Sequence, residues 1–407
     1  MVFWQTLYNN ANLKNLSGLD NLTSIDGDLY IRSNAILTSL SGLDNLTSIG
    51  GGVDIFENNS LPNLTGLNNL NSIGKDLGIK NNRVLTSLLG LENLISIGGS
   101  LYIGDISREN DALTSLTGLN NLKSTGGDIR ITNNTALTSL SGLDNLTSIG
   151  GYLEIGSNTT LTNLSGLDKL TSIGGYININ SNVSLMNLSG LDNLTSVGEH
   201  LEIHGNDALQ NLTGLDKLTK IMGYLNISDN NALTSLSGIQ NINPLTIESQ
   251  YDTYKDLDIN ANINLSECKV KSICDFLDLP DKTIDINYNM SGCNSETEIK
   301  NTCQGTPLCS NLINPKNGSS DIDITTHLSW SVSTNANGYK LTAGTSSGGT
   351  DIEDNTDVGN VTTYYLADLP YNSNIYVTIT PYNESGNAIG CTEVRFSTKK
   401  VTHNNQH

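Results

Sequence analysis

The sequence predicts an all-β-dominated protein: a leucine-rich parallel β-solenoid of ten 24-residue coils, a small α/β cap held by disulfide bonds, and a last domain of short strands. Three observations predict this architecture. A glycine recurs at a fixed period, each period contains one short segment of alternating apolar and polar residues, and five of the six cysteines lie between Cys268 and Cys309. We expect the solenoid to span 1–265, the cap 266–306, the last domain 307–400 and a tail 401–407.

The recurring glycine defines the length of the repeat. Successive glycines are 24 residues apart, except for one interval of 28 residues, in which the segment 105–111 carries four extra residues. Self-similarity at one fixed period is the sequence signature of a repeat architecture. The glycines are Gly18, Gly42, Gly66, Gly90, Gly118, Gly142, Gly166, Gly190, Gly214 and Gly238.

One unit shows how each coil is built. The segment 152–156 alternates with period two, which predicts a short strand with Leu153 and Ile155 buried. Leucines recur every third residue before it, as at Leu137 and Leu140, a spacing that suits a coil turning corners with its leucines inward. Stacked coils would place parallel strands about 4.8 Å apart and form a rod about 50 Å long. One coil buries its apolar ring only against its neighbours, so a single repeat would not fold.

Two columns of asparagine accompany the leucines. One follows each strand isoleucine by three residues, and we expect these side chains to be buried and to hydrogen-bond the turn backbone of adjacent coils as a ladder. Its members are Asn34, Asn58, Asn82, Asn134, Asn158, Asn182, Asn206 and Asn230. The second column follows the recurring glycine by three residues, as at Asn69 and Asn145. Lys169 and Lys217 replace it in two coils, so we expect this column to be exposed.

The residues of the unit carry a resemblance to known repeats. The pattern Leu153-x-Ile155-x-x-Asn158-x-x-Leu161 resembles a leucine-rich repeat. The whole unit, GLDNLTSIGGYLEI at 142–155, is similar to the receptor L domain repeats of growth-factor receptor ectodomains and of many bacterial surface proteins. The resemblance covers about 7–265. It implies a right-handed β-solenoid that binds a ligand or acts as a spacer, and not catalysis.

The cysteines predict a disulfide-bonded cap in an oxidising compartment. Around 268–277 the apolar spacing suits a short helix, a strand follows at 283–287, and a second helix begins after Asn294 or Ser295. We expect two disulfide bonds in the cap, with their pairing open, and a third, Cys309–Cys391, in the last domain. A zinc site is the alternative, although the spacings are irregular and no histidine lies nearby. The cap cysteines are Cys268, Cys274, Cys293 and Cys303.

The last domain has a pattern of its own. Trp330 in LSWS and the run 369–378 resemble the antiparallel β-sandwich of fibronectin type III domains, with Tyr376 as the residue of a tyrosine corner. A cap followed by such a domain resembles secreted bacterial proteins that are exported to the cell surface. We therefore expect a secreted or cell-surface bacterial protein, whose signal peptide and any sorting or anchoring segment are absent from this chain.

Charge and motifs exclude several classes of function. The net charge of −20, with the 21 Lys and Arg residues unclustered, disfavours nucleic acid as a partner. No apolar run approaches the roughly 20 residues that a membrane span requires. The sequence contains no nucleophile elbow, phosphate-binding glycine loop or histidine metal motif, so we expect no enzymatic activity and no cofactor.

The outward strand positions are the candidate ligand site, because they vary between units while the inward positions are uniform. Exposed aromatic residues can stack on sugars or anchor a protein partner. The alternative is that tyrosine simply suits strand surfaces and cross-strand pairing. The candidate ligand-binding residues are Tyr30, Tyr102, Arg130, Tyr152, Glu154, Tyr176, His200, Glu202 and Tyr224, and Asp54, Asn178 and Asn226 share the same face.

These residues lead us to expect a non-catalytic extracellular binding or adhesion module with a protein or glycan ligand. The alternative is a structural cell-surface spacer, or an element that self-associates end to end through its first coil, which has no evident cap. A minor alternative is ice binding by two columns of threonine hydroxyls. These columns are Thr38, Thr86, Thr114, Thr138, Thr162 and Thr234, and Thr23, Thr47, Thr147, Thr171 and Thr195.

A column of carboxylates follows the recurring glycine by two residues. Four of them come from consecutive coils, so like charges would stack at strand spacing unless solvated or bridged. Weak Ca²⁺ binding is one interpretation, and Asx-turn chemistry is the other. The four residues are Asp144, Asp168, Asp192 and Asp216.

Overall fold

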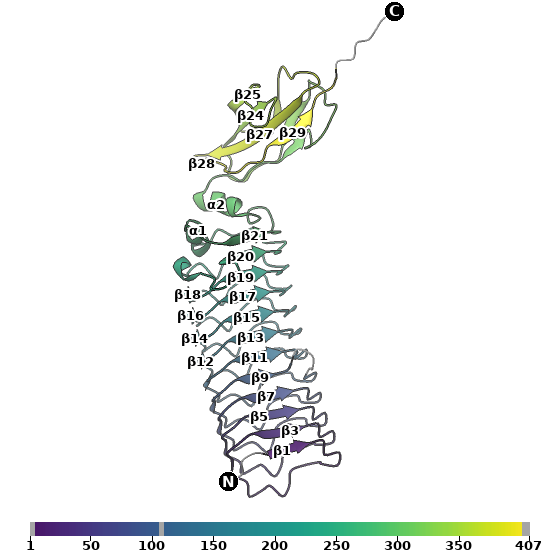
Figure 1. Ribbon diagram of the computed structural model, residues 1–407, viewed down its shortest axis with the longest axis vertical. Helices are drawn as coiled ribbons and strands as arrows, with labels where there is room; N and C mark the ends of the chain where they lie inside the picture. The colour runs from purple at the N-terminus through teal and green to yellow at the C-terminus, as the bar shows by residue number, and fades with distance from the viewer. Residues whose placement is uncertain (1–4, 106–109, 401–407) are drawn as a thin grey trace, which may run out of the picture. The chain divides into compact units, whose positions relative to one another are not determined.

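The computed structural model describes residues 5–105 and 110–400. The chain divides into two compact units, 1–293 and 294–407. The first unit is a solenoid of stacked coils (Figure 1), and the second consists of antiparallel sheets preceded by one helix. Part of the predicted four-residue insertion, 106–109, and the predicted tail lie outside the described residues.

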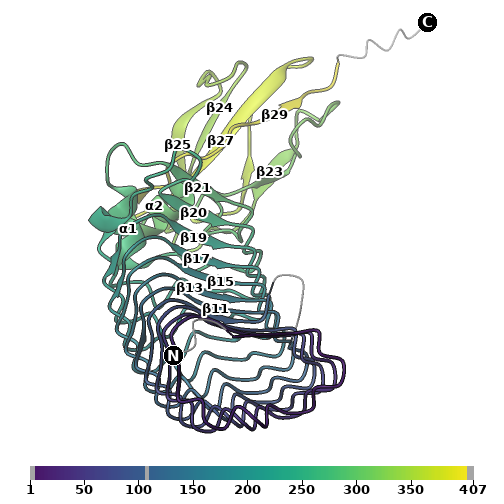
Figure 2. The same ribbon diagram turned by 60° about the horizontal axis from the view of Figure 1, so that its bottom comes forward.

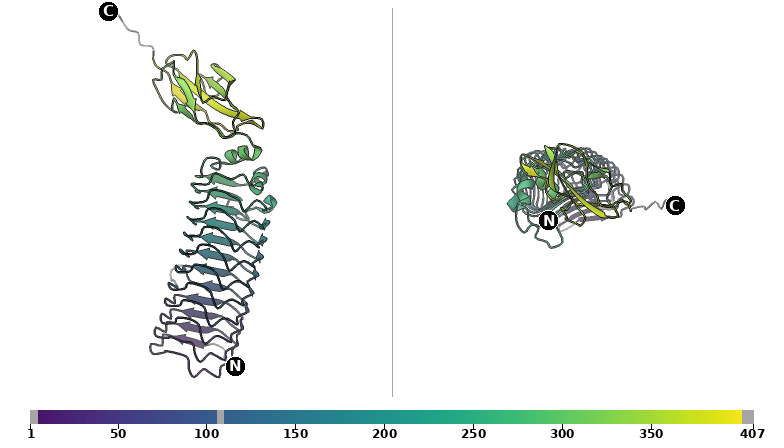
Figure 3. Two further views of the ribbon diagram at one scale, coloured as in Figure 1. Left: turned by 180° about the vertical axis from the view of Figure 1, so that it is seen from behind. Right: turned by 90° about the horizontal axis from the view of Figure 1, so that it is seen from above.

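Twelve parallel strands form the long sheet of the solenoid, stacked in chain order (Figures 1 and 3). Each residue pairs with its counterpart one repeat later, as Leu153 does with Ile177 and Ile177 with Leu201. The strands are β1 (Gln5–Tyr8), β3 (Leu29–Arg32), β5 (Val53–Phe56), β7 (Leu77–Lys80), β9 (Leu101–Ile103), β11 (Ile129–Thr132), β13 (Leu153–Gly156), β15 (Ile177–Asn180), β17 (Leu201–His204), β19 (Leu225–Ser228), β20 (Leu257–Asn260) and β21 (Ile284–Asn287).

A second parallel sheet of nine two-residue strands runs along the corner that precedes the long strands from β3 to β19. Figure 2 shows the coils following one behind another along the stack. Its strands are β2 (Ser24–Ile25), β4 (Ser48–Ile49), β6 (Ser72–Ile73), β8 (Ser96–Ile97), β10 (Ser124–Thr125), β12 (Ser148–Ile149), β14 (Ser172–Ile173), β16 (Ser196–Val197) and β18 (Lys220–Ile221).

The interior is the predicted apolar ring. Leu137 and Leu140 from the corners and Leu153 and Ile155 from β13 are all 0% exposed, as are their counterparts in most coils. Each such side chain contributes about 1.5–3 kcal/mol through burial. The recurring glycine makes this stacking possible. Gly142 has φ +116°, and a Cβ there would lie 2.1 Å from the Leu116 carbonyl oxygen of the preceding coil.

The predicted asparagine ladder is present and longer than expected. In one coil, Asn158 is fully buried, its Nδ2 donates to the Ile131 carbonyl at 2.9 Å, and its N–H donates to Asn182 Oδ1 at 3.1 Å. The same contact continues through Asn110, which the insertion moves out of the expected position, and ends at Asn289 in the cap. The ladder therefore spans the insertion without a break.

The long sheet has two strands more than the ten coils predicted. β1 precedes the first recurring glycine, and β21 belongs to the segment expected to form a separate cap. Ile284-Asp-Ile-Asn in β21 repeats the pattern Leu257-Asp-Ile-Asn of β20, and the two strands pair residue by residue. The cap thus continues the solenoid because it keeps the same alternation of apolar and polar side chains.

The first predicted cap helix and the disulfide bonds of the cap cysteines are present. Helix α1 (Lys271–Leu277) buries Ile273 and Phe276. A disulfide bond joins Cys268 to Cys293, and Cys274 and Cys303 are also disulfide-bonded. Before β20 lies an insertion that contains a short 3-10 helix, η1 (Pro244–Thr246).

The second unit begins with α2 (Glu296–Gln304), which is capped by the Ser295 side chain accepting from the Glu298 N–H. Three strands form one antiparallel sheet: β22 (Leu312–Asn314), β23 (His327–Trp330) and β26 (Thr363–Tyr365). Five form the other: β24 (Gly338–Gly344), β25 (Glu353–Gly359), β27 (Asn374–Asn383), β28 (Gly386–Asn387) and β29 (Val394–Ser397).

Side chains from both sheets of the second unit share one core around Trp330, Tyr339 and Phe396. The predicted Cys309–Cys391 disulfide is present. Tyr376 is only half-buried, because the alternation of β27 turns Ile375 and the following valine inward. The buried tyrosine is instead Tyr339, whose hydroxyl accepts from a backbone N–H. Among the described residues, no helix is long and apolar enough to cross a membrane.

Candidate functional site

The outward face of the long sheet brings the predicted site residues into two columns. The strand register aligns one outward residue from the middle of each strand, and we call this row the central column. Tyr30, Tyr102, Arg130, Glu154 and Glu202 all lie in it, as predicted. From β1 to β21 the central column is Thr6, Tyr30, Asp54, Gly78, Tyr102, Arg130, Glu154, Asn178, Glu202, Asn226, Asp258 and Asp285.

The second row, which we call the aromatic column, lies at the residue before each strand. Tyr152, Tyr176, His200 and Tyr224 stack face to face with ring centroids 4.4–4.5 Å apart and planes within 10°. Tyr254 adds a fifth ring at 4.7 Å from Tyr224. It comes from the insertion before β20, where the repeat register is lost, so periodicity gave no signal for it.

Stacking determines what the aromatic column can offer a ligand. Each inner ring has both faces covered by its neighbours, and Tyr224 is only 3% exposed. Burial raises the pKa of the Tyr176 and Tyr224 hydroxyls and lowers the pKa of His200. The Tyr224 hydroxyl donates to Glu202 Oε1 at 2.5 Å. This geometry is that of cross-strand pairing, and it leaves ring edges rather than ring faces toward solvent.

In the middle of the central column, charged side chains pair with one another. Arg130 Nε lies 3.1 Å from Glu154 Oε2, and these side chains are 24% and 18% exposed. Burial raises the pKa of Glu154, and the Arg130 guanidinium opposes that rise. Arg130 and Glu154 thus form an ion pair, although within the described residues Arg130 Nε makes no hydrogen bond.

Between β3 and β9 the same face is hollowed. A depression of about 360 Å³ lies over Gly78, which we call the Gly78 hollow. Sequence reasoning passed over Gly78 because it has no side chain to suggest a role. The lining residues are Asp28, Tyr30, Arg32, Gly52, Val53, Asp54, Lys75, Asp76, Gly78, Lys80 and Tyr102.

Hydrogen bonds and cation–π contacts order one wall of this hollow. Arg32 Nε lies 2.5 Å from Asp54 Oδ2, and its guanidinium carbon lies 4.5 Å from the centre of the Tyr30 ring. The Tyr30 hydroxyl donates to Asp28 Oδ2 at 2.8 Å, while Asp28 Oδ1 accepts from the Gly52 N–H at 2.7 Å. The Gly52 N–H and the Tyr30 hydroxyl together lower the pKa of Asp28.

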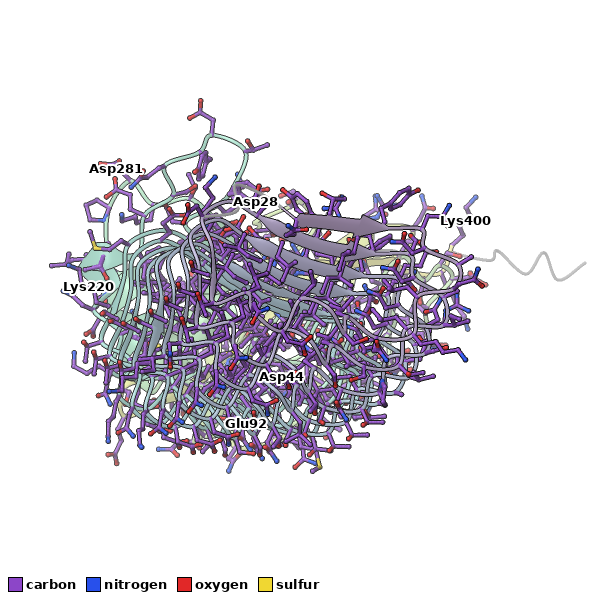
Figure 4. All side chains as sticks on the ribbon, turned by 90° about the horizontal axis from the view of Figure 1, so that it is seen from below. Asp28, Asp44, Glu92, Lys220, Asp281 and Lys400 are labelled. Atoms are coloured by element: carbon purple, nitrogen blue, oxygen red, sulfur yellow. A yellow bond between two sulfur atoms is a disulfide. The ribbon has the colours of Figure 1, made fainter. Side chains whose placement is uncertain are left out.

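The carboxylate and threonine columns lie elsewhere on the coil. Asp144, Asp168, Asp192 and Asp216 each accept a hydrogen bond from the backbone N–H of the glycine two residues earlier, at 2.8–3.2 Å. The donor lies two residues before the carboxylate, whereas in an Asx turn it lies two residues after it, so these carboxylates fix their own turns by a different local bond from the expected Asx turn. Figure 4 shows two members of the column, Asp44 and Glu92, on the side away from the long sheet. Among the described residues, no group of three or more His, Cys, Asp or Glu side chains could hold one metal ion.

The threonine hydroxyls make contacts between coils. Thr171 Oγ1 donates to the Thr147 carbonyl oxygen at 3.2 Å, and Thr47 and Thr195 repeat this bond. In the other column, Thr38, Thr86, Thr114 and Thr234 donate to the preceding coil in the same way. Their hydrogen atoms are thus directed at the protein backbone.

One comparison with known families bears on the chain. Residues 195–304 match the family model of the receptor L domain, a ligand-binding kind of domain. The match includes β16 to β20 and the cap, and the coils before residue 195 repeat the same apolar and asparagine columns. No curated protein matches the sequence.

Proposed function

We propose that this protein is a non-catalytic extracellular binding module, which recognises a protein or glycan on the outward face of its long sheet. The observation that carries the proposal is the contrast between the columns of the coil. The leucine and asparagine columns are nearly uniform and hold the coils together. The aspartate column bonds within its own turn and the threonine columns bond to the preceding coil, and both kinds of column are interrupted in several coils. The central column changes chemistry from coil to coil and contains the Gly78 hollow.

Two further observations support an extracellular role. Disulfide bonds at Cys268–Cys293 and Cys309–Cys391 are characteristic of proteins that fold in oxidising compartments. The family match is to a ligand-binding kind of domain. Adhesion of one cell surface to another is the use that we propose for such a module.

The proposal includes the absence of catalysis and of a required cofactor. The turn carboxylates Asp144 and Asp168 are already bonded to backbone N–H groups, and Arg130 and Glu154 neutralise each other. Titration of the full chain with Ca²⁺ in a calorimeter tests the cofactor part. We expect no binding heat, and saturable heat that disappears in an Asp168→Asn variant would contradict it.

Binding arrays test the proposal as a whole. The full chain is applied to protein and glycan arrays, and the ligand found is then measured against three outward variants spread along the face: Tyr102→Ala, Asn178→Arg and Asp285→Arg. Thr147→Arg, which changes an exposed residue in another column, is the matched control. We expect at least one outward variant to lose about tenfold in affinity or more, which is about 1.4 kcal/mol. If the control loses as much, or all three bind like the wild type, the outward face is not the binding surface.

A structural spacer is the second candidate, and one observation favours it. The rings of the aromatic column cover each other along five successive positions, from Tyr152 to Tyr254. This arrangement ties the coils together. A spacer that assembles end to end would give a mass in light scattering that rises with protein concentration, together with no ligand on either array.

A further inference from the structure

The Gly78 hollow arises where two side chains are missing from the outward face. The register places Gly78 between Asp54 on β5 and Tyr102 on β9, so a column that otherwise carries side chains has a gap there. Gly52 leaves a second gap in the row before the strands, and it too lines the hollow. Together they account for a depression of about 360 Å³ on an otherwise closely packed sheet.

Aromatic rings with fixed orientation stand on opposite sides of the gap. Tyr30 is held by its hydroxyl on Asp28 and by the Arg32 guanidinium over its ring. On the other side, Lys80 Nζ lies 5.2 Å from the centre of the Tyr102 ring. Unlike the rings of the aromatic column, Tyr30 and Tyr102 are three strands apart and do not cover each other.

The charges around the hollow balance. Three carboxylates line it, Asp28, Asp54 and Asp76, against three cations, Arg32, Lys75 and Lys80. These groups keep hydrogen-bonding capacity beyond the bonds within the protein. A carboxylate oxygen can accept about two hydrogen bonds, and Asp76 Oδ1 accepts one from the Ser100 N–H. A guanidinium has about five donor hydrogens, and Arg32 donates to Asp54 through Nε. The hollow thus offers donors and acceptors in comparable number.

We propose that the Gly78 hollow binds a neutral sugar unit, a hexose or N-acetylhexosamine of a glycan; this rests on the proposed function and specifies its ligand. Sugar hydroxyls each donate and accept, which matches the mixed lining, and the open flanks suit a unit within a longer chain. An anionic group would meet as many carboxylates as cations and so gains no net attraction from the lining, and an apolar side chain would leave these charged groups without partners. The volume lies at the small end of ligand pockets, about 300–1,000 Å³.

Preorganisation favours binding at this place. Asp28 is fixed by the Gly52 N–H and the Tyr30 hydroxyl, and Asp54 by Arg32. A ligand that binds such fixed groups loses little side-chain entropy in the protein, so more of the interaction energy appears as affinity. The long sheet supplies the rigidity because β3, β5, β7 and β9 are paired without a break in register.

Filling the hollow tests the proposal without disturbing the fold. A Cβ on Gly78 would first meet Asp54 Oδ1 at 2.9 Å and Lys80 Cε at 3.5 Å, both far out on side chains, and the φ of Gly78 is not positive. Gly78→Gln therefore inserts a side chain into the hollow, and the Asp54 carboxylate must move aside to admit it. Asn178→Gln enlarges a residue of the same column four strands further along, and it serves as the matched control.

The probes are oligosaccharides ending in glucose, galactose, mannose or N-acetylglucosamine, arrayed beside sialylated and sulfated ones. We expect the full chain to bind members of the neutral set, with the affinity of Gly78→Gln lower by about tenfold or more and that of Asn178→Gln within about twofold, measured by calorimetry. Circular dichroism melting of both variants checks that they fold.

The outcomes separate this inference from the proposed function. Neutral-glycan binding that Gly78→Gln leaves unchanged overturns the inference, as does binding restricted to sialylated or sulfated glycans. A protein ligand that is lost in Asn178→Arg, with no glycan binding, overturns the inference but keeps the proposed function. No ligand of either class on the outward face overturns both.

Discussion

Removing one rung of the asparagine ladder tests the account of how the coils are held together. We consider Asn158→Ala in the middle of the solenoid. Asn158 Oδ1 accepts from the Asn134 N–H at 3.1 Å, and its Nδ2 donates to the Ile131 carbonyl at 2.9 Å. Both contacts join the Asn158 coil to the preceding one, and the Asn158 side chain is 0% exposed. Alanine removes both.

The magnitude follows from what each partner loses. The buried Asn134 N–H is left without an acceptor, which costs about 1–3 kcal/mol of stability. The lost hydrogen bond to the Ile131 carbonyl costs about 0.5–1.5 kcal/mol more. The Asn134 side chain keeps its bonds to the Ile103 and Thr132 carbonyls. We therefore expect Asn158→Ala to lower the free energy of unfolding by about 1.5–4.5 kcal/mol.

Asn69→Ala is the matched control, because Asn69 belongs to the exposed column and its Nδ2 makes one bond, to the Asp44 carbonyl at 2.7 Å. Asn69→Ala should lower the free energy of unfolding by less than about 1 kcal/mol. Guanidinium unfolding of the full chain, followed by circular dichroism, measures both. Repeat arrays can open in parts, so hydrogen exchange of the amides near Asn134 localises the effect. Equal losses in the two variants would refute the burial argument.

Three further predictions concern the outward face. Tyr176→Ala removes two stacked contacts and should lower the free energy of unfolding by at least about 1–3 kcal/mol, whereas Tyr176→Phe keeps them and should change it little, both measured by chemical denaturation. Burial and the neighbouring Asp285 raise the pKa of Asp258 to about 6, above its unfolded value of 3.8. The free energy of unfolding should therefore fall as pH rises from about 4 to 6, by about 1 kcal/mol once solvent exposure is allowed for. Asp258→Asn should abolish this pH dependence, measured as a series of unfolding curves at different pH. Burial lowers the pKa of His200, so stability should instead fall as pH drops below about 6.5; His200→Phe should remove this loss, and an unchanged acid slope would contradict it.

Features that recur in every coil because their residues are buried could be predicted from the sequence. Leu153 and Ile155 alternate along the strand because the inside of each coil admits only apolar side chains, and the buried Asn158 recurs because turn backbone groups need partners. The same reasoning placed Tyr30 and Tyr102 on the outward face. The four cap cysteines were predicted to be disulfide-bonded, but only the structure shows that Cys268 pairs with Cys293.

Features that depend on a break in the period could not be predicted. Asn110 belongs to the ladder and Tyr254 to the aromatic column although neither keeps the 24-residue spacing, so no count of residues reveals them. β21 was expected in a separate cap for the same reason. Gly78 was not predicted as a site residue, because a hollow can depend on an absent side chain and glycine carries no functional group that indicates a role.

The spacing of parallel strands explains why an irregular position is the better candidate for binding. Adjacent coils lie about 4.8 Å apart, so like side chains in register contact each other. Tyr176 and His200 accordingly stack at 4.5 Å, and Arg130 pairs with Glu154. A regular column therefore satisfies itself and presents little to a ligand. At Gly78 the column is interrupted, so Asp54 and Tyr102 each lack a side-chain neighbour in register on the side that faces the gap. On this proposal, recognition by the solenoid depends on where its repeat is broken, and its stability depends on where the repeat is kept.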